Sequence, residues 1–186
     1  MKKNKFVHQF EQGTSLIEIL VAVMIIGIMA ALALPNWFNY VNEQRLNQAN
    51  EATETLLRTA QNRAKQEAQA FNVEFRMSNN IPQASMYRNN GSATDCWTYL
   101  NSIGNQRSTR DNCLNLAEAN RITLSTSYGN RITFTDTGSI APTSQLQPNE
   151  NLSFTLTGIP NTPYRCIRIK TLLGAIDKGK DSTECQ

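Results

Sequence analysis

The feature that most constrains this chain is an apolar run near its start. From Leu16 to Leu34 the only charged residue is Glu18, and the other residues are apolar or glycine. A helix needs roughly 20 such residues to cross the hydrocarbon core of a bilayer. A spanning segment must also satisfy its own backbone polar groups, which a helix does. A helix buried in a soluble core is the alternative, but such a helix normally carries one polar face. The run therefore predicts a transmembrane helix.

The residues before the run indicate how it is used. Residues 1–13 contain Lys2, Lys3 and Lys5, and a short basic leader stays on the cytoplasmic side by the positive-inside rule. A secretory signal is cut after its apolar region, at small residues, whereas this run closes on Ala-Leu-Pro. The abrupt junction is Gly13, ahead of the run. Cleavage there would leave the apolar helix at the new N-terminus of the protein.

The junction and the run together resemble a known processing motif. Residues 13–22 read Gly-Thr-Ser-Leu-Ile-Glu-Ile-Leu-Val-Ala, which is similar to the prepilin motif of type IV pilins and type II secretion pseudopilins. In that family a prepilin peptidase cuts after the glycine and methylates the new amine. The resemblance implies cleavage between Gly13 and Thr14 and N-methylation of Thr14, although the family usually begins its mature chain with Phe. The family's glutamate and its frequent Gly and Pro have counterparts at Glu18, Gly27 and Pro35.

The chemistry of Glu18 supports the same role. A carboxylate in hydrocarbon costs at least about 2.5 kcal/mol and is normally partnered, yet no basic residue of the same helix is within reach. After cleavage, the free amine of Thr14 in a neighbouring copy would neutralise it. That partner exists only where helices stack in parallel, so we hypothesise that Glu18 directs assembly with other subunits. A glutamate that snorkels to the headgroups is the alternative.

A second helical segment is expected beyond the run. Pro35 should bend or interrupt the helix at the membrane exit. The aromatic residues Trp37, Phe38 and Tyr40 suit either a membrane-interface belt or packing against protein. From Val41 to about Phe71, small and apolar residues recur at three- and four-residue steps, which predicts an amphipathic stem helix. The predicted buried stripe consists of Leu46, Ala49, Thr53, Leu56, Ala60, Ala64, either Glu67 or Ala68, and Phe71.

The rest of the chain is predicted to be a β-rich head. Alternating residues indicate strands at 73–77, 122–126, 131–135, 152–156 and 166–169. The sequence Asn79-Asn80-Ile81-Pro82 is expected to end the first strand, and residues 128–130 to join the second and third as a hairpin. Residues 136–150 read as a loop. The predicted fold is α+β, with a long helix packed on a small antiparallel sheet. Its divisions are a removed leader (1–13), an assembly helix (14–35), a stem helix (36–71) and a head (72–186).

The order of these elements is similar to the head of pseudopilin H and FimT-like minor pilins. The resemblance includes residues 164–169, which read Tyr-Arg-Cys-Ile-Arg-Ile, and a glycine near the C-terminus. It implies a β-rich head packed on the stem helix. Competence-associated FimT-like minor pilins carry Gly-Arg-x-Arg in this region, a signature implicated in DNA binding. Here the corresponding residues are Gly174-Ala175-Ile176-Asp177, so the resemblance does not carry that activity over.

The four cysteines all lie in the predicted head, on the side that would be exported. An even count there argues for disulfides, and three pairings are open. We favour Cys96–Cys113 with Cys166–Cys185, because each closes a local loop and contributes about 3 kcal/mol. A metal site is not expected, because no Cys-x-x-Cys occurs and the single histidine, His8, lies in the leader.

One basic concentration stands out in the head. It comprises Arg165, Arg168, Lys170, Lys178 and Lys180. Acidic residues stand beside it, so a solvated strand and tail of mixed charge is one interpretation. The other is a weak contact with a polyanion such as DNA, which would weaken steeply with salt. The formal net charge of +3 comes largely from the leader and does not itself argue for nucleic acid.

The sequence predicts no catalytic residues, because no nucleophile elbow, phosphate loop or metal spacing is present. We therefore expect neither an enzyme nor a cofactor. The predicted function is a minor pilin-like subunit of a type IV pilus, cut by prepilin peptidase. It would be held in the inner membrane with its head exported, and then built into a surface filament. Two alternatives stay open, a type II secretion pseudopilin and a filament-displayed DNA-binding minor pilin.

Overall fold

The structure is a computed structural model. It describes residues 15–106, 108–118, 120–126, 129–156, 164–181 and 183–185, with the backbone alone at 32–36, 39 and 156. The chain divides into two units, Met1–Tyr40 and Val41–Gln186, and each is considered by itself below. Residues 1–14 lie outside the described residues, and with them the predicted leader and both residues of the predicted cleavage site, Gly13 and Thr14.

The first element, α1, is a continuous helix over Leu16–Glu67. Pro35 lies within it, and the predicted interruption does not occur. The helix ends four residues before the predicted boundary, because Ala68 adopts a positive φ of 48°. The N–H of Gln69 then donates to the carbonyl of Ala64 at 3.2 Å, which is the six-to-one bond of a Schellman C-cap.

Within Val41–Gln186, the part of α1 from residue 41 to 67, here called the outer half, buries one face. The predicted stripe is at most 2% exposed from Leu46 to Ala64. At its end the prediction is wrong, because Glu67 and Ala68 are both exposed where the helix ends. Four of the stripe positions carry alanine or threonine, so a sheet can approach the helix axis closely. The buried stripe consists of Leu46, Ala49, Thr53, Leu56, Leu57, Ala60 and Ala64.

The first of two sheets is antiparallel and has the order β3-β2-β1-β5. Its strands are β1 (Phe71–Ser78), β2 (Ile81–Arg88), β3 (Cys113–Asn115) and β5 (Arg131–Phe134). Phe71, Val73 and Phe75 of β1 point into the core, as their alternation predicts. Strands β2 and β3 were not expected from the sequence.

The turn between β1 and β2 explains why β2 was missed. Asn79 and Asn80 have φ of 51° and 59°, which is the type I′ geometry of a two-residue hairpin. These residues were expected only to end the first strand. Instead β2 begins directly after the turn, at Ile81, and Pro82 lies opposite Met77. Along an antiparallel pair of strands, hydrogen-bonded residue pairs alternate with non-hydrogen-bonded pairs. Next to a two-residue turn, Ser78 and Ile81 form a hydrogen-bonded pair, so Met77 and Pro82 form a non-hydrogen-bonded pair. The missing N–H of Pro82 therefore removes no hydrogen bond to β1.

The second sheet is also antiparallel and has the order β4-β6-β7-β8. Its strands are β4 (Ile122–Thr126), β6 (Asn151–Leu156), β7 (Arg165–Ile169) and β8 (Ile176–Gly179). Strands β6 and β7 are close to the predicted positions and pair with each other. Residues 135–150 form no strand beyond one isolated bridge, from Phe134 to Ile140, in agreement with the predicted loop.

The predicted hairpin between β4 and β5 is wrong. The two strands exist, but β4 pairs with β6 and β5 pairs with β1, so they belong to different sheets. Asn130, just before β5, helps to hold this strand against β1. Its backbone carbonyl accepts the N–H of Phe75 at 2.8 Å, and its side-chain amide donates to the carbonyl of Phe75 at 2.9 Å. Alternation locates a strand, whereas its partner depends on contacts far away in the sequence.

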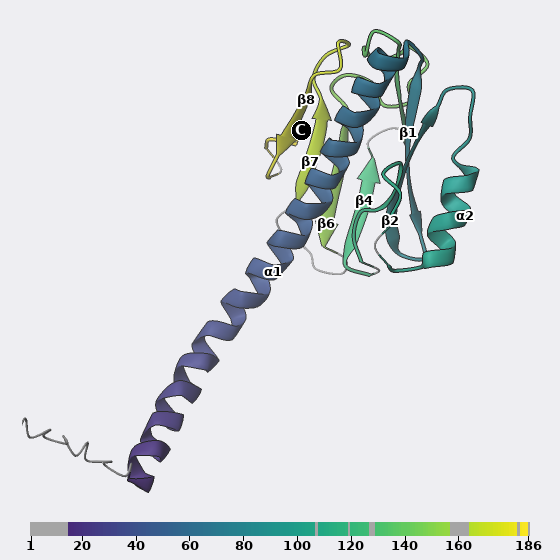
Figure 1. The fold of residues 1–186 in the computed structure, drawn as a ribbon. Coiled ribbons are helices and arrows are strands. Elements are labelled where there is room, and N and C mark those ends of the chain that lie inside the picture. Colours follow the sequence, from purple (N-terminus) through teal and green to yellow (C-terminus); the bar gives the residue numbers. More distant parts are fainter. Residues whose placement is uncertain are drawn as a thin grey trace, which may run out of the picture. The chain divides into compact units, whose positions relative to one another are not determined.

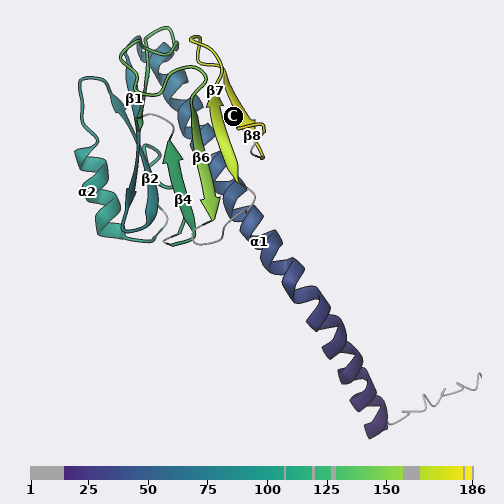
Figure 2. The ribbon, with the colours of Figure 1, turned by 180° about the vertical axis from the view of Figure 1, so that it is seen from behind.

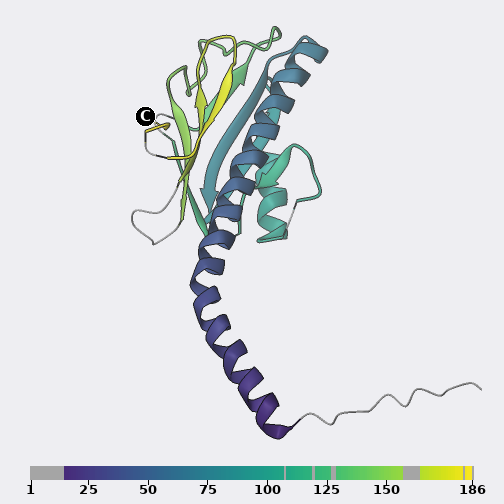
Figure 3. The same cartoon turned by 90° about the vertical axis from the view of Figure 1, so that its left-hand side faces the viewer.

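Both sheets cover the same side of the outer half of α1, as opposite views show (Figures 1 and 2). In Figure 3 the strands of the second sheet lie to one side of that part of the helix. Phe75 and Phe134 from the first sheet and Phe154 from the second are at most 1% exposed. The core of the head is therefore one layer of side chains between α1 and two sheets.

A second helix, α2 (Thr94–Ile103), was not expected from the sequence. It buries Leu100 and is tied to β3 by the disulfide Cys96–Cys113. The other disulfide, Cys166–Cys185, joins β7 to the C-terminal turn. This is the pairing that the loop-size argument favoured. Gly179 packs against the second disulfide, since a Cβ there would lie 2.6 and 2.7 Å from its two sulfur atoms.

Candidate functional site

The first candidate site is the apolar part of α1, residues 16–31, here called the assembly segment. All of its large apolar side chains are between 49% and 76% exposed. An exposed apolar surface of this extent marks a site of interaction with protein or membrane. Among the described residues, no helix is both long enough and apolar enough to cross a membrane. The exposed side chains are Leu16, Ile17, Ile19, Leu20, Val21, Val23, Met24, Ile25, Ile26, Ile28 and Met29.

Glu18 is the charged residue of the assembly segment, and it is exposed in the first turn of α1. Its backbone N–H donates to the carbonyl of Ser15 at 3.0 Å. A carboxylate at this end of a helix is favoured by the helix dipole. No ion pair to Glu18 occurs among the residues that the structure describes. The carboxylate is thus available to a partner outside its own helix.

Gly27 and Pro35 are the other residues predicted to act in assembly, and the structure says different things about each. Gly27 lies in the middle of the segment, and a Cβ built there meets nothing within 4 Å. Nothing in the described chain therefore requires glycine at this position. The backbone of Pro35 is helical, and its side chain lies outside the described residues. Trp37, Phe38 and Tyr40 are all more than half exposed, which leaves both of their predicted roles as predictions.

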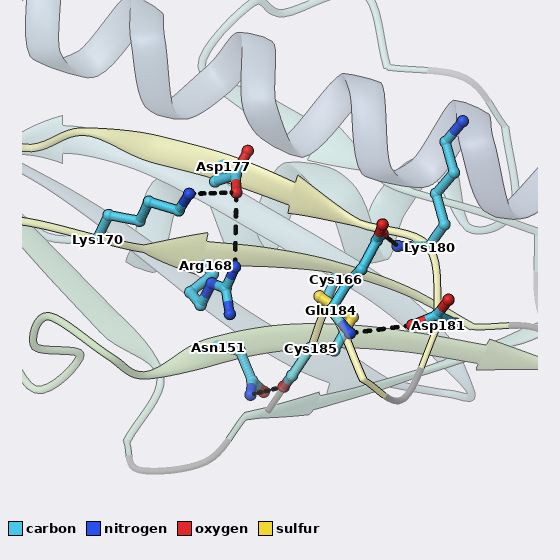
Figure 4. Close-up of polar contacts among 9 residues, drawn as sticks. All are labelled: Asn151, Cys166, Arg168, Lys170, Asp177, Lys180, Asp181, Glu184 and Cys185. Atoms are coloured by element: carbon cyan, nitrogen blue, oxygen red, sulfur yellow. Dashed lines mark hydrogen bonds and ion pairs between the residues drawn. A yellow bond between two sulfur atoms is a disulfide. The ribbon is translucent and has the colours of Figure 1, made fainter.

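The second candidate site is the basic concentration on β7 and β8, which Figure 4 shows in part. Arg165 is 8% exposed and points inward. Its Nε donates to Oδ1 of Asn47 on α1 at 2.7 Å, and its Nη1 donates to the carbonyl of Lys180 at 3.1 Å. Arg165 therefore joins the C-terminal region to the outer half of α1. It thus offers little surface to a polyanion.

Three further members of the cluster are held in ion pairs. Arg168 and Lys170 both approach Asp177, at 3.5 and 2.8 Å. Lys178 reaches Glu54 on α1 at 2.7 Å. The hydrogen bond from Lys170 is the main cause that lowers the pKa of Asp177, and the one from Lys178 has the same effect on the pKa of Glu54. These cations neutralise carboxylates of the same chain.

The C-terminal turn that follows is also fixed internally. The carboxylate of Asp181 accepts the N–H groups of Thr183 and Glu184 at 3.0 and 2.9 Å, and Glu184 accepts the N–H of Lys180 at 2.7 Å. The Thr183 hydroxyl also donates to Asp181, at 2.6 Å. Its hydrogen bond is the main cause that lowers the pKa of Asp181. Lys180 itself remains exposed. The predicted polyanion site is thus brought together in space, but its charges are largely balanced within the head.

The possible ligands for a metal ion lie apart in the described part of the chain. No three His, Cys, Asp or Glu side chains of the described chain gather closely enough to hold a metal ion. All four cysteines of the sequence are in disulfides. Sequence reasoning also missed Gln61, whose side-chain amide contacts the carbonyls of Gly138, Leu173 and Gly174. A polar residue on a predicted helix face carries no signal of its tertiary partner.

Comparison with known proteins bears on the fold. No protein-family model matches the chain, and no curated protein matches it in sequence. Among solved structures, the chain is similar to the type IV minor pilin FimU of Pseudomonas aeruginosa, with a TM-score of 0.51 and 15% identity. The match covers 79% of this chain and 99% of that one. The chain therefore has a type IV pilin-like α+β fold.

Proposed function

We propose that this chain is a minor pilin-like structural subunit of a type IV pilus. The observation that carries the proposal is the division of one helix into two surfaces. The outer half of α1 is covered by the head, whereas the assembly segment exposes an apolar surface with a single carboxylate. A pilin-like fold with such a segment needs partners that cover it, and parallel copies of the same helix provide them.

The proposed route begins in the inner membrane. The apolar run from Leu16 to Leu34 holds the subunit there with its head exported, and prepilin peptidase cuts between Gly13 and Thr14. The new amine of Thr14 is methylated. When helices leave the bilayer and stack, Glu18 of one subunit pairs with the Thr14 amine of its neighbour. The protein is a substrate of enzymes in this proposal and has no catalytic role or cofactor of its own.

The proposal is tested by peptide mass spectrometry of sheared surface filaments and of the membrane fraction. We expect an N-terminal peptide that begins at methylated Thr14 in the sheared material. The same processed peptide confined to membranes would favour the alternative, a type II secretion pseudopilin. An intact leader in every fraction would overturn both, because the apolar run would then be only an anchor.

The DNA-binding alternative gains no support from the head. Of the five cations proposed to contact a polyanion, one is buried and three are in ion pairs. Phosphates would have to compete with Asp177 and Glu54 for Arg168, Lys170 and Lys178. A gel-shift assay of the full chain in detergent with duplex DNA at low salt is the direct check. We expect no shift, and a shift that disappears with added salt would restore this alternative.

A further inference from the structure

A hollow lies beside the outer half of α1. A cavity of about 650 Å³ opens there between the helix, the residues that follow α2 and the segment that leads from β3 into β4. In Figure 1, α2 and β4 lie on one side of this part of α1, and β7 and β8 lie on the other. The volume is within the range of pockets that bind small ligands, about 300–1,000 Å³. We call this hollow the α1 cavity.

One wall of the α1 cavity is a polar stripe on the helix. It includes Arg45, Gln48, Ala52 and Thr55, which follow one another at the three- and four-residue spacing of a single helix face. Gln48 and Thr55 are exposed. This stripe runs beside the buried one, so the head covers its neighbour on the helix and leaves these polar side chains facing the cavity.

The opposite wall is held in place by Asn115, at the end of β3. Its side-chain amide donates to the carbonyls of Gly104 and Gln106 at 2.8 and 2.9 Å. The segment before β4 is tied to the turn between β1 and β2, because the N–H of Asn120 donates to the carbonyl of Asn80 at 3.0 Å. The cavity is therefore already formed before a ligand arrives, which lowers the entropic cost of binding.

The charges of the α1 cavity are balanced among its described lining residues. They comprise Arg45 and Arg121 on one side of the balance and Glu51 and Glu118 on the other. The guanidinium of Arg45 and the carboxylate of Glu118 are 4.0 Å apart, which is too far for a hydrogen bond, so both groups can still bind a ligand. A ligand with a net charge would be attracted by one pair of charges and repelled by the other, whereas a neutral ligand meets no such opposition.

The apolar part of the lining offers little surface. Leu116 and Ile122 are 5% and 0% exposed, and the remaining apolar side chains, Ala52 and Ala117, are small and half-buried. A protein partner usually anchors in a pocket through a large aromatic or apolar side chain, and this lining gives such an anchor little to cover. The accessible groups are amides, guanidinium groups, carboxylates and a hydroxyl, which together both donate and accept hydrogen bonds.

We propose that the α1 cavity binds a neutral carbohydrate, a short oligosaccharide of hexose units. Each hydroxyl of such a ligand both donates and accepts a hydrogen bond, so the ligand can use the arginines as donors and the glutamates as acceptors at the same time. The side-chain amides of Gln48 and Gln106 offer a donor and an acceptor each. This inference goes beyond the filament role and does not depend on it, because the lining lies wholly within Val41–Gln186.

A glycan array tests the class of ligand. The full chain, purified in a detergent without a sugar headgroup, is applied to an array that carries neutral, sialylated and sulfated oligosaccharides. We expect binding to neutral oligosaccharides that is equal at low and high salt, because a neutral ligand releases no counterions. Binding confined to the sialylated or sulfated ligands, binding that is lost with added salt, or binding to none of the three classes would overturn the proposal.

Variants in the helix wall test the location of the site. Gln48→Ala should weaken binding roughly threefold to tenfold, the loss of one hydrogen bond or two. Gln66→Ala is the matched control, an exposed glutamine of α1 outside the cavity lining, and should have no effect. Thr55→Trp should fill the cavity and abolish binding, whereas Asn62→Trp, at an exposed position outside the lining, should not.

All four variants should keep the unfolding midpoint of the unmodified chain, because each changes an exposed side chain. This measurement separates a lost ligand from a lost fold, and Gln48→Ala decides the matter if Thr55→Trp does not fold. Full binding by Gln48→Ala, or by a folded Thr55→Trp, would place the carbohydrate elsewhere on the head and would overturn the α1 cavity as its site.

Discussion

The two halves of α1 share one continuous helix and yet have opposite surroundings. In the assembly segment the apolar side chains are at least 49% exposed, whereas the buried stripe of the outer half is at most 2% exposed. The stripe is narrow and rich in alanine, which suits a sheet packed against one face. The assembly segment is apolar around its whole circumference. Helix formation is a local property, but what covers a helix is determined by the rest of the chain or by its neighbours.

The largest expected contrast comes from deleting one apolar side chain in each half. Leu57 is fully buried, so Leu57→Ala should destabilise the head by about 2–5 kcal/mol. Ile26 is 64% exposed, and Ile26→Ala should change stability by less than about 0.5 kcal/mol. The measurement is urea unfolding of the full chain in mild detergent, followed by Trp97 fluorescence in a Trp37→Phe background. Equal losses in the two variants would contradict the division of the helix.

The next contrast concerns the disulfides, because both lie in the head and the unit up to Tyr40 contains no cysteine. Replacing Cys166 and Cys185 by alanine removes a cross-link that spans 19 residues and should cost about 3 kcal/mol. Reduction of the unmodified chain should lower the unfolding midpoint in the same assay. Helicity of the first unit, followed by isotope-edited infrared spectroscopy, should stay unchanged. A loss of helix there on reduction would show that the two units are not independent.

Glycine offers a smaller contrast. A Cβ at Gly179 would lie within 2.7 Å of both sulfur atoms of Cys166–Cys185, whereas one at Gly27 meets nothing within 4 Å. We expect Gly179→Ala to destabilise the head by about 1–3 kcal/mol through overpacking. Gly27→Ala should leave the head unaffected and favour the helix by up to about 1 kcal/mol. The same unfolding assay measures both variants. A neutral Gly179→Ala would mean that the disulfide can shift without cost.

The smallest contrast concerns the carboxylates of the two halves. Glu54 pairs with Lys178 and Arg58 at 2.7 and 2.8 Å, so Glu54→Gln should destabilise the head by about 1 kcal/mol at neutral pH. Its pKa is lowered from 4.5 in the folded chain, chiefly by Lys178. This stabilisation is therefore complete above that value and is lost as the pH falls through the lower, folded pKa. The difference between Glu54→Gln and the unmodified chain should vanish in acid.

The matched change, Glu18→Gln, should not alter the stability of the head at any pH, because Glu18 has no ion-pair partner among the described residues. It should instead lower the amount of chain in sheared filaments at least tenfold. Unchanged incorporation would contradict the proposed pairing with the Thr14 amine and would favour a glutamate that only reaches toward the headgroups.

Several parts of this protein followed from the sequence. The buried stripe of α1 as far as Ala64, the positions of β6 and β7 and the loop at 136–150 are local patterns of polarity, and burial selects for those patterns directly. The cysteine pairing followed from loop size. The prepilin-like motif also depends on residues 13–22 alone, and its processing remains a prediction because the cleavage site lies outside the described residues.

The tertiary structure decided what local pattern could not. It placed β4 and β5 in different sheets, joined β2 to β1 through Asn79-Asn80, and balanced the basic residues of β7 and β8 with carboxylates from β8 and α1. Each of these depends on which distant residues meet, and periodicity carries no information about partners. The same reason hid the contact between Gln61 and the turn after β7, since the two lie far apart in the sequence.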